Sequence, residues 1–290
     1  MAPRMQELAT KLMDSRAYYD LLAKDYEQED QFWDNPYDNE IWRLEHEIIR
    51  PHLDVSKPLL DVGCGFYPHD DFGPSMRIIA GDISFSSLLV ARDHRPQGHT
   101  VDFITFDAHS LPFPDESFHQ VIAGGELFNH VDYRRVSSEL GRIISGNGCL
   151  LIEFGTKWCL DSLWAILDSV LGNRIGYSMT TTEAKLFFGF NGSDVEVTWE
   201  VTPRGKLTVK LLKARNVRNA LESAGFMVDK IISTNFLSGI IPLPWQQDSG
   251  SHLVRGLAKA LIQADRVLGR IPWLNLFAGN IFLLCKRRVG

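Results

Sequence analysis

The sequence offers little that would direct the chain to nucleic acid or across a membrane. Its 36 acidic residues outnumber its 30 basic ones, so no overall positive field attracts nucleic acid, which leaves only a local basic patch for that role. No apolar run approaches the roughly 20 residues that span a bilayer. The best candidate, 271–285, is interrupted by Asn275, Gly279 and Asn280. We therefore expect neither a nucleic-acid substrate nor a bilayer-spanning segment.

Signs of a metal centre and of secretion are also missing. The four cysteines, Cys64, Cys149, Cys159 and Cys285, are scattered, with no C-x-x-C pair and no metal-ligand spacing. Residues 1–16 lack the apolar stretch of a secretory signal. These absences predict reduced thiols, no metal, and a cytoplasmic protein that touches a membrane at most peripherally.

What the chain does contain is a regular alternation of short apolar segments and helical stretches from residue 58 onward. This pattern is typical of βαβ units. It predicts an α/β fold, a doubly wound, seven-stranded, mostly parallel sheet with helices on both faces. The expected strands are 58–62, 77–81, 101–105, 119–123, 148–154, 226–233 and 279–286. The expected helices between them are 84–93, 109–112, 132–144 and 214–224.

Four regions follow from this pattern. Residues 1–57 are predicted to be helical, with helices at 5–30 and 39–52, and residues 58–155 to form the core of the sheet. Residues 156–211 are predicted to be an inserted cap with a helix at 156–172. The cap ends in a hairpin whose strands, 194–200 and 206–211, are joined by a Pro203-Arg204-Gly205 turn. Residues 212–290 complete the sheet and contain an amphipathic helix at 251–270.

The strongest local signal is the glycine loop, Leu60-Asp61-Val62-Gly63-Cys64-Gly65-Phe66, at the end of the first strand. Glycines there let the backbone turn sharply and approach a ligand, at the sheet edge where ligands of open α/β sheets bind. A G-x-G pair alone is weak evidence. Asp61 sharpens it, because a carboxylate there can accept hydrogen bonds from a cationic amine.

Two further acids follow the next two strands. Asp82 ends the second strand, where an acid can accept hydrogen bonds from both hydroxyls of a ribose. Asp107 follows the third, placed to accept from an adenine amino group. Each acid alone could be an ordinary loop carboxylate. Together with Asp61 they predict one site for an adenosine with a positively charged tail.

These residues resemble the motifs of class I S-adenosylmethionine-dependent methyltransferases of the small-molecule branch. Residues 61–65 look like the D-x-G-x-G signature, Asp82 like the acid that ends the second strand, and 107–118 like D-A-x-x-L-P-F-x-D-x-S-F, the most specific match. The resemblance also takes in Tyr18–Tyr26, similar to the Y-Y-D-x-x-A-x-x-Y helix, and the 121–131 strand and loop. Segments 156–211 and 234–278 match no motif of the family.

The resemblance implies an enzyme, a methyltransferase that binds S-adenosyl-L-methionine. Tyr26 would close over the cofactor with the N-terminal helix, and the third glycine that the family often has is replaced by Tyr67, followed by Pro68. The cofactor-binding residues implied by the motifs and their positions are Asp61, Gly63, Gly65, Asp82, Ile83, Asp107, Ala108, Gly124 and Tyr26.

The catalytic residue is less defined. His130 follows the fourth strand and could serve as a general base, although a structural, hydrogen-bonded histidine is the commoner alternative. Glu126 and Tyr26 are open to the same two interpretations. Methyl transfer from a sulfonium chiefly needs alignment, so an essential base is not required. The Asn35-Pro36-Tyr37 sequence is interpreted as an ordinary turn rather than a motif of amino-group DNA methyltransferases.

Three functions remain open. Methyl transfer to a small, apolar or lipid-like acceptor is favoured, because the segments expected to cap the site are rich in Trp, Phe and Leu. A nicotinamide-dependent oxidoreductase would need a third glycine where Pro68 stands. A non-catalytic S-adenosylmethionine-binding protein is the third reading.

The helix 251–270 has two interpretations as well. Its apolar stripe and its basic side, with Arg255, Lys259, Arg266 and Arg270, could lie on an anionic membrane. Alternatively, the stripe packs on the domain or on a second subunit in a homodimer, and this is favoured.

Overall fold

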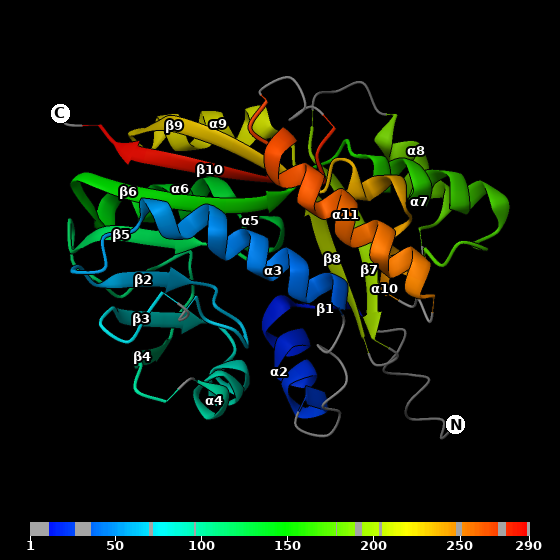
Figure 1. The fold of residues 1–290 in the computed structure, drawn as a ribbon. Coiled ribbons are helices and arrows are strands. Elements are labelled where there is room, and N and C mark those ends of the chain that lie inside the picture. The colour runs from blue at the N-terminus through cyan, green and yellow to red at the C-terminus, as the bar shows by residue number, and fades with distance from the viewer. Residues whose placement is uncertain are drawn as a thin grey trace.

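A computed structural model describes residues 12–26, 36–69, 72–95, 97–177, 179–188, 193–202, 205–247, 251–271 and 277–288. Its centre is a seven-stranded sheet with the strand order β4-β3-β2-β5-β6-β10-β9 (Figure 1). Only β10 runs antiparallel to its neighbours, β6 and β9. The strands are β2 (Leu59–Val62), β3 (Arg77–Asp82), β4 (Thr100–Thr105), β5 (Phe118–Ala123), β6 (Ile144–Gly155), β9 (Phe226–Thr234) and β10 (Asn280–Arg287). The predicted doubly wound, mostly parallel sheet is confirmed.

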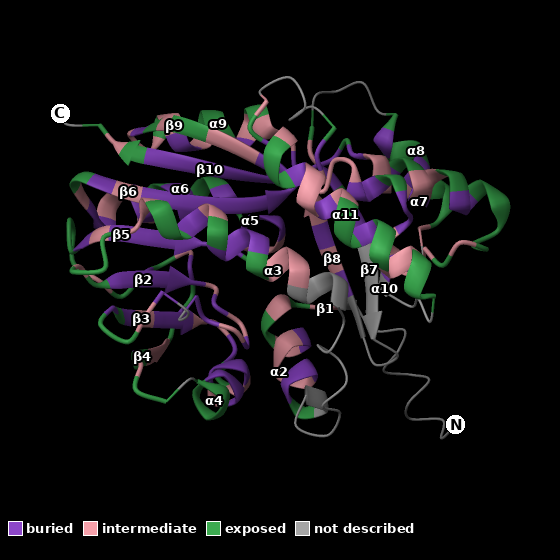
Figure 2. Cartoon of the chain, viewed as in Figure 1, coloured by how far each residue is buried: buried purple, intermediate pink, exposed green. Residues whose placement is uncertain are grey.

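Helices cover both faces of this sheet, which explains why its central strands are nearly continuous apolar runs. On one face, α6 (Tyr133–Ile143) and α9 (Ala214–Ser223) bury Val136, Leu140 and Leu221. On the other, α3 (Pro36–Ile49) and α4 (Phe85–His94) contribute Ile49 and Leu88. Figure 2 shows β2, β5, β6 and β10 as mainly buried strands between these layers. The core therefore fixes the strand ends that carry the predicted site.

The predicted hairpin forms a second, smaller sheet. Its strands β7 (Val195–Thr202) and β8 (Gly205–Leu211) pair antiparallel, and the short strand β1 (Leu12–Met13) pairs parallel to β8. Helix α2 (Ser15–Tyr26) buries Tyr18 and Leu22 in a cluster that also contains Phe66 of the glycine loop and hairpin residues. The N-terminal segment and the inserted segment therefore pack on each other and on the glycine loop.

Several local predictions were wrong. Residues 109–112 form no helix, because a turn follows β4: the main-chain N–H of Ser110 donates to the Asp107 carbonyl. The helix expected over 156–172, α7 (Leu160–Leu171), begins later, because Lys157 donates its main-chain N–H to Leu212. Of the helix expected at 5–30, residues 12–13 form a strand, and residues 1–11 and 27–30 lie outside the described residues. Of the turn expected at Asn35-Pro36-Tyr37, Asn35 lies outside the described residues, and Pro36 begins helix α3. The structure adds η1 (Arg50–His52), α5 (Leu127–His130) and α8 (Thr181–Phe187).

The long connection between β9 and β10 contains η2 (Ser238–Ile240), α10 (Leu243–Gln247) and α11 (His252–Leu268). Two basic residues of α11 pair with α3: Lys259 with Glu40 and Arg266 with Glu47, both at 2.9 Å. The predicted apolar stripe is divided, with Ala258 and Ile262 buried and Leu253 and Leu257 exposed. Among the described residues, no helix has the length and apolar character to cross a membrane.

Candidate functional site

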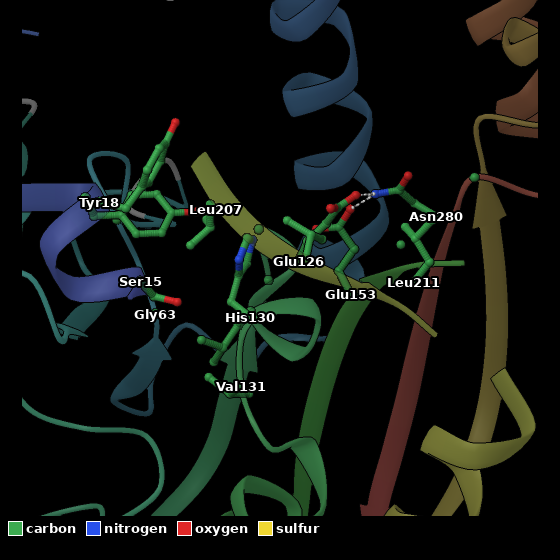
Figure 3. Close-up of a pocket in the computed structure, with 18 of the residues that line it drawn as sticks. Ser15, Tyr18, Gly63, Glu126, His130, Val131, Glu153, Leu207, Leu211 and Asn280 are labelled. Atoms are coloured by element: carbon green, nitrogen blue, oxygen red, sulfur yellow. Dashed lines mark hydrogen bonds between the residues drawn. The ribbon is translucent and has the colours of Figure 1, made fainter. Parts of the chain in front are cut away.

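A cavity of about 1270 Å³ lies at the carboxyl ends of β2, β3 and β5. It extends from the glycine loop to the hairpin, and α2 and α3 also contribute to its walls. Figure 3 shows part of this lining, with Tyr18, Gly63, His130 and Glu126 around the same space. Side chains from segments far apart in the sequence therefore converge where open α/β sheets bind ligands.

The glycine loop has the backbone that its sequence predicts. Gly63 and Gly65 have φ angles of +75° and +57°, which L side chains rarely adopt. The N–H groups of Gly63 and Cys64 donate to the Gly81 carbonyl at 2.7 and 3.1 Å, which ties the loop to β3. At Gly65, a Cβ would meet no atom within 4 Å. The loop thus presents bare backbone to the cavity.

Asp82 is held at the end of β3 by two main-chain donors. The N–H of Gly65 donates to one carboxylate oxygen at 3.0 Å and that of Ser84 to the other at 2.8 Å. Burial nevertheless raises the pKa of Asp82, because desolvation opposes the charged form. Asp82 and Ile83 both line the cavity. The carboxylate is therefore fixed beside the glycine loop, with lone pairs left for a ligand hydroxyl.

Asp107 and Ala108 line the cavity beyond β4. One Asp107 oxygen accepts from the His109 N–H at 2.9 Å and lies 2.7 Å from the His109 Nδ1 atom. Partial burial opposes the charged form, but these hydrogen bonds prevail and lower the pKa of Asp107. The carboxylate is thus ionised, half exposed, and able to accept a further donor.

Asp61 occupies a different place from the one expected. It is fully buried, does not line the cavity, and accepts from the His69 main-chain N–H at 2.7 Å, with the His69 ring Nδ1 at 3.0 Å. Its other oxygen has no hydrogen-bond partner among the described residues. His69 does line the cavity. A side chain at Gly124 would collide with the His69 ring, at 2.7 Å, which explains the glycine there.

Two carboxylates face the same cavity, and of these the sequence analysis considered Glu126 but not Glu153. Glu126 and Glu153 both accept from the side-chain amide of Asn280, at 2.8 and 2.6 Å. Burial, and next the charge of Glu153, raise the pKa of Glu126 to about 7. An acid within the apolar strand 148–154 was the available signal for Glu153, since buried carboxylates are rare without a partner.

His130 lies at the end of α5 and lines the cavity. Its Nδ1 atom is buried and has no hydrogen-bond partner in the described part of the chain, so the alternative of a hydrogen-bonded structural histidine finds no support at this atom. Burial lowers the pKa of His130 to about 4, so its ring is neutral at pH 7. The His130 ring packs edge-on against the Tyr19 ring, with 6.0 Å between the ring centroids.

Tyr26 ends α2, but its side chain lies outside the described residues. Tyr18, Tyr19 and Leu22 are the residues of this helix that line the cavity. The sequence therefore identified the helix, and the structure assigns its cavity face to neighbouring positions. Of the predicted set, the structure brings together Gly63, Gly65, Asp82, Ile83, Asp107, Ala108, Gly124 and His130.

Comparisons with known proteins agree with this geometry. A family model described as a methyltransferase domain matches residues 60–152. An uncharacterized protein of Methanocaldococcus jannaschii is 24% identical over 230 residues, 77% of this chain and 80% of that protein. A solved S-adenosylmethionine-dependent methyltransferase of Thermotoga maritima shares the fold, with a TM-score of 0.55 and 14% identity over 94% of this chain and 99% of its own.

A demethylmenaquinone methyltransferase of Listeria welshimeri is 34% identical over 99 residues, which is 32% of this chain. The match spans 42% of that relative's length, so it covers less than half of that enzyme. Residues 60–152 therefore match a methyltransferase domain, and the chain shares its fold with a solved S-adenosylmethionine-dependent methyltransferase.

Proposed function

We propose that the chain transfers the methyl group of S-adenosylmethionine to a small acceptor with a large apolar part. The observation that carries this proposal is the continuity of the cavity from the glycine loop to the hairpin. One end offers bare backbone and carboxylates, and the other offers aliphatic side chains. A polar cofactor and an apolar acceptor would meet between them.

The cofactor end is assigned from the contacts already described. Asp82 would accept from the ribose hydroxyls, and Gly63 and Gly65 would let the cofactor approach the backbone. Asp107 and Ala108 would receive the adenine, with Ile83 and Gly124 as walls. Asp61 would act through His69, which it holds by two contacts. A role for Tyr26 stays a prediction.

The acceptor end is lined mainly by the inserted segment. The aliphatic residues that line it are Ala165, Met179, Val197, Leu207, Val209, Leu211 and Leu243. The match to demethylmenaquinone methyltransferases supports an acceptor with an apolar ring or chain. Burial against aliphatic walls at about 25 cal/mol per Å² would supply much of its affinity.

Within this cavity the chain's main task would be alignment. Bound S-adenosylmethionine supplies a methyl group on a positively charged sulfur, and the walls would hold the acceptor atom in line with it. His130, neutral and without a partner at Nδ1, could accept a proton from an acceptor that loses one. We assign His130 this role as a hypothesis, since alignment alone accelerates such transfers.

Replacing one methyl group of Val209 on β8 with a hydroxyl group tests whether the hairpin forms the acceptor end of the cavity. Val209 lines the cavity, whereas the neighbouring Thr208 has the opposite orientation on the strand. Val209→Thr should raise the KM for an apolar acceptor roughly fivefold, which corresponds to a loss of about 1 kcal/mol of binding free energy. The affinity for S-adenosylmethionine should stay unchanged. The acceptor is found by mass spectrometry of co-purified ligands, with reduced demethylmenaquinone as the first probe in a labelled-methyl assay.

Thr208→Val is the matched control, and it should leave both constants near their wild-type values. An equal change in KM for the two variants would contradict the assignment of the hairpin as an acceptor wall. So would a loss of cofactor affinity in Val209→Thr alone, because that residue would then belong to the cofactor end.

Contact of the 251–270 helix with a membrane or a second subunit stays a prediction. Leu253 and Leu257 are exposed, but two of the basic residues once expected to meet lipid are paired with α3. The free basic surface is therefore smaller than the sequence suggested, and packing within the domain accounts for much of this helix.

A further inference from the structure

Two buried carboxylates accept hydrogen bonds from the same side-chain amide, and the three residues come from different parts of the chain. Glu126 precedes α5, Glu153 lies on β6, and Asn280 begins β10. The Asn280 amide donates to Glu126 at 2.8 Å and to Glu153 at 2.6 Å (Figure 3). Glu126 also has a φ angle of +57°, a conformation that a non-glycine residue keeps only where its surroundings enforce it. The pair is thus a built feature of the cavity.

The pair has no lysine or arginine partner among the described residues. No lysine or arginine there forms an ion pair with either carboxylate, and the nearest polar support comes from another acid, Glu45 of α3, at Glu153. Burial raises the pKa of Glu153, and the Asn280 amide and the charge of His69 offset only part of that effect. Tyr19 of α2 faces Glu126. Two neighbouring buried carboxylates cannot both ionise cheaply. We therefore expect the pair to hold one proton in the protein without cofactor.

A second observation points to a missing positive charge. His130 lines the same cavity, and its Nδ1 atom is buried without a partner in the described chain. Burial lowers its pKa, so this ring does not neutralise the carboxylates at neutral pH. The cavity therefore combines these carboxylates with an unused ring nitrogen, and in the described part of the chain neither carboxylate has a lysine or arginine partner.

The pair also lies next to the cofactor end. Leu127, which follows Glu126, packs on the glycine loop: its Cδ1 atom would be 2.8 Å from a Cβ at Gly63. The sulfonium of S-adenosylmethionine joins the ribose to the methionine tail, so it belongs between Asp82 and this loop. We propose that the Glu126–Glu153 pair is the counter-charge of the sulfonium and gives up its shared proton to water when S-adenosylmethionine binds. This inference rests on the proposed cofactor end.

The chemistry of the product follows directly. S-adenosylhomocysteine carries a neutral thioether in place of the sulfonium, so the pair would take back its proton from water once the methyl group has left. The pair offers no charge attraction to this neutral thioether. The pair would then favour the substrate form of the cofactor over the spent form.

Calorimetry with both cofactor forms tests this inference without an acceptor. S-adenosylmethionine and S-adenosylhomocysteine are titrated at pH 6.5 in phosphate and in Tris, whose ionisation enthalpies differ. The dependence of the heat on the buffer measures proton release. Because burial raises the pKa of Glu126 to about 7, S-adenosylmethionine should release more than half a proton and S-adenosylhomocysteine almost none. Both ligands carry the same α-amino group, so any proton that this group releases contributes equally to the two measurements.

Glu126→Gln should bind S-adenosylmethionine with no proton release and with a reduced preference over S-adenosylhomocysteine. Glu222→Gln, an exposed acid on α9 paired with Arg218, is the matched control and should keep the wild-type release. The wild-type protein gives an independent readout that needs no variant. Its preference for S-adenosylmethionine should fall roughly tenfold or more between pH 7.5 and 5.5.

Buffer-independent heat for S-adenosylmethionine would overturn this inference alone. Equal release by the two ligands would also overturn it, because the ammonium group they share would then be the cause. Absence of any S-adenosylmethionine binding would overturn the proposed function as well, so the two failures are distinguishable.

Discussion

Replacing Asp82 with alanine should weaken S-adenosylmethionine binding by about 1–3 kcal/mol, roughly fivefold to more than a hundredfold in Kd. The substitution removes the proposed acceptor for the ribose hydroxyls. It also leaves the N–H groups of Gly65 and Ser84 without the carboxylate that accepts from them, so the glycine loop loses a tie to β3. Equilibrium titration of the folded variant measures the effect.

Asp102→Ala provides the matched control on the adjacent strand. Asp102 pairs with Arg77 at 2.8 Å on the surface, where both side chains are largely exposed, and such pairs contribute little. Cofactor affinity should stay at the wild-type value in this variant. Unchanged affinity in a folded Asp82→Ala protein would remove Asp82 from the site.

Gly65→Ala should weaken S-adenosylmethionine binding by more than tenfold. The backbone at residue 65 has a φ angle of +57°, which costs an L residue about 1–2 kcal/mol. The added methyl group would project into open space in the cavity, where the cofactor is expected to approach. The first effect lowers the free energy of unfolding, and the second lowers affinity. Thermal melting and titration separate them.

Gly98→Ala isolates the first effect. Gly98 has a φ angle of +85°, also has no atom within 4 Å of a Cβ position, and is exposed away from the cavity. Its substitution should cost similar stability with no loss of cofactor affinity. If Gly65→Ala bound S-adenosylmethionine as well as Gly98→Ala does, close approach of the cofactor at the loop would be contradicted.

Much of the sheet could be predicted because its signals are local. Apolar strands buried on both faces, such as β2 and β5, are short continuous runs, and the helices α6 and α9 have a clear amphipathic period. Contacts distant in sequence were not predictable in this way. The parallel pairing of β1 with β8 joins residues 12–13 to 206–207, and nothing in either segment specifies the other.

The site shows the same division. Asp82 and Asp107 line the cavity as expected, because a residue that ends a parallel strand must lie at that edge of the sheet. Asp61 does not line the cavity, since its carboxylate is in contact with the main-chain N–H and the ring of His69, eight residues later. The Glu126–Glu153 pair depends on Asn280, whose place beside β6 comes from the antiparallel last strand. Sequence motifs therefore predicted the location of the cofactor end. The positions of Asp61, Glu126 and Glu153 depend on tertiary contacts that no motif specifies.

Calorimetric titration of the purified protein with S-adenosylmethionine and, separately, with NAD tests the central claim most directly. The proposed site predicts saturable binding of one S-adenosylmethionine per chain, since one glycine loop and one set of strand-end acids hold it. NAD should give no binding, because the third glycine of its fingerprint is replaced by Pro68. Binding of NAD with no binding of S-adenosylmethionine would contradict the account.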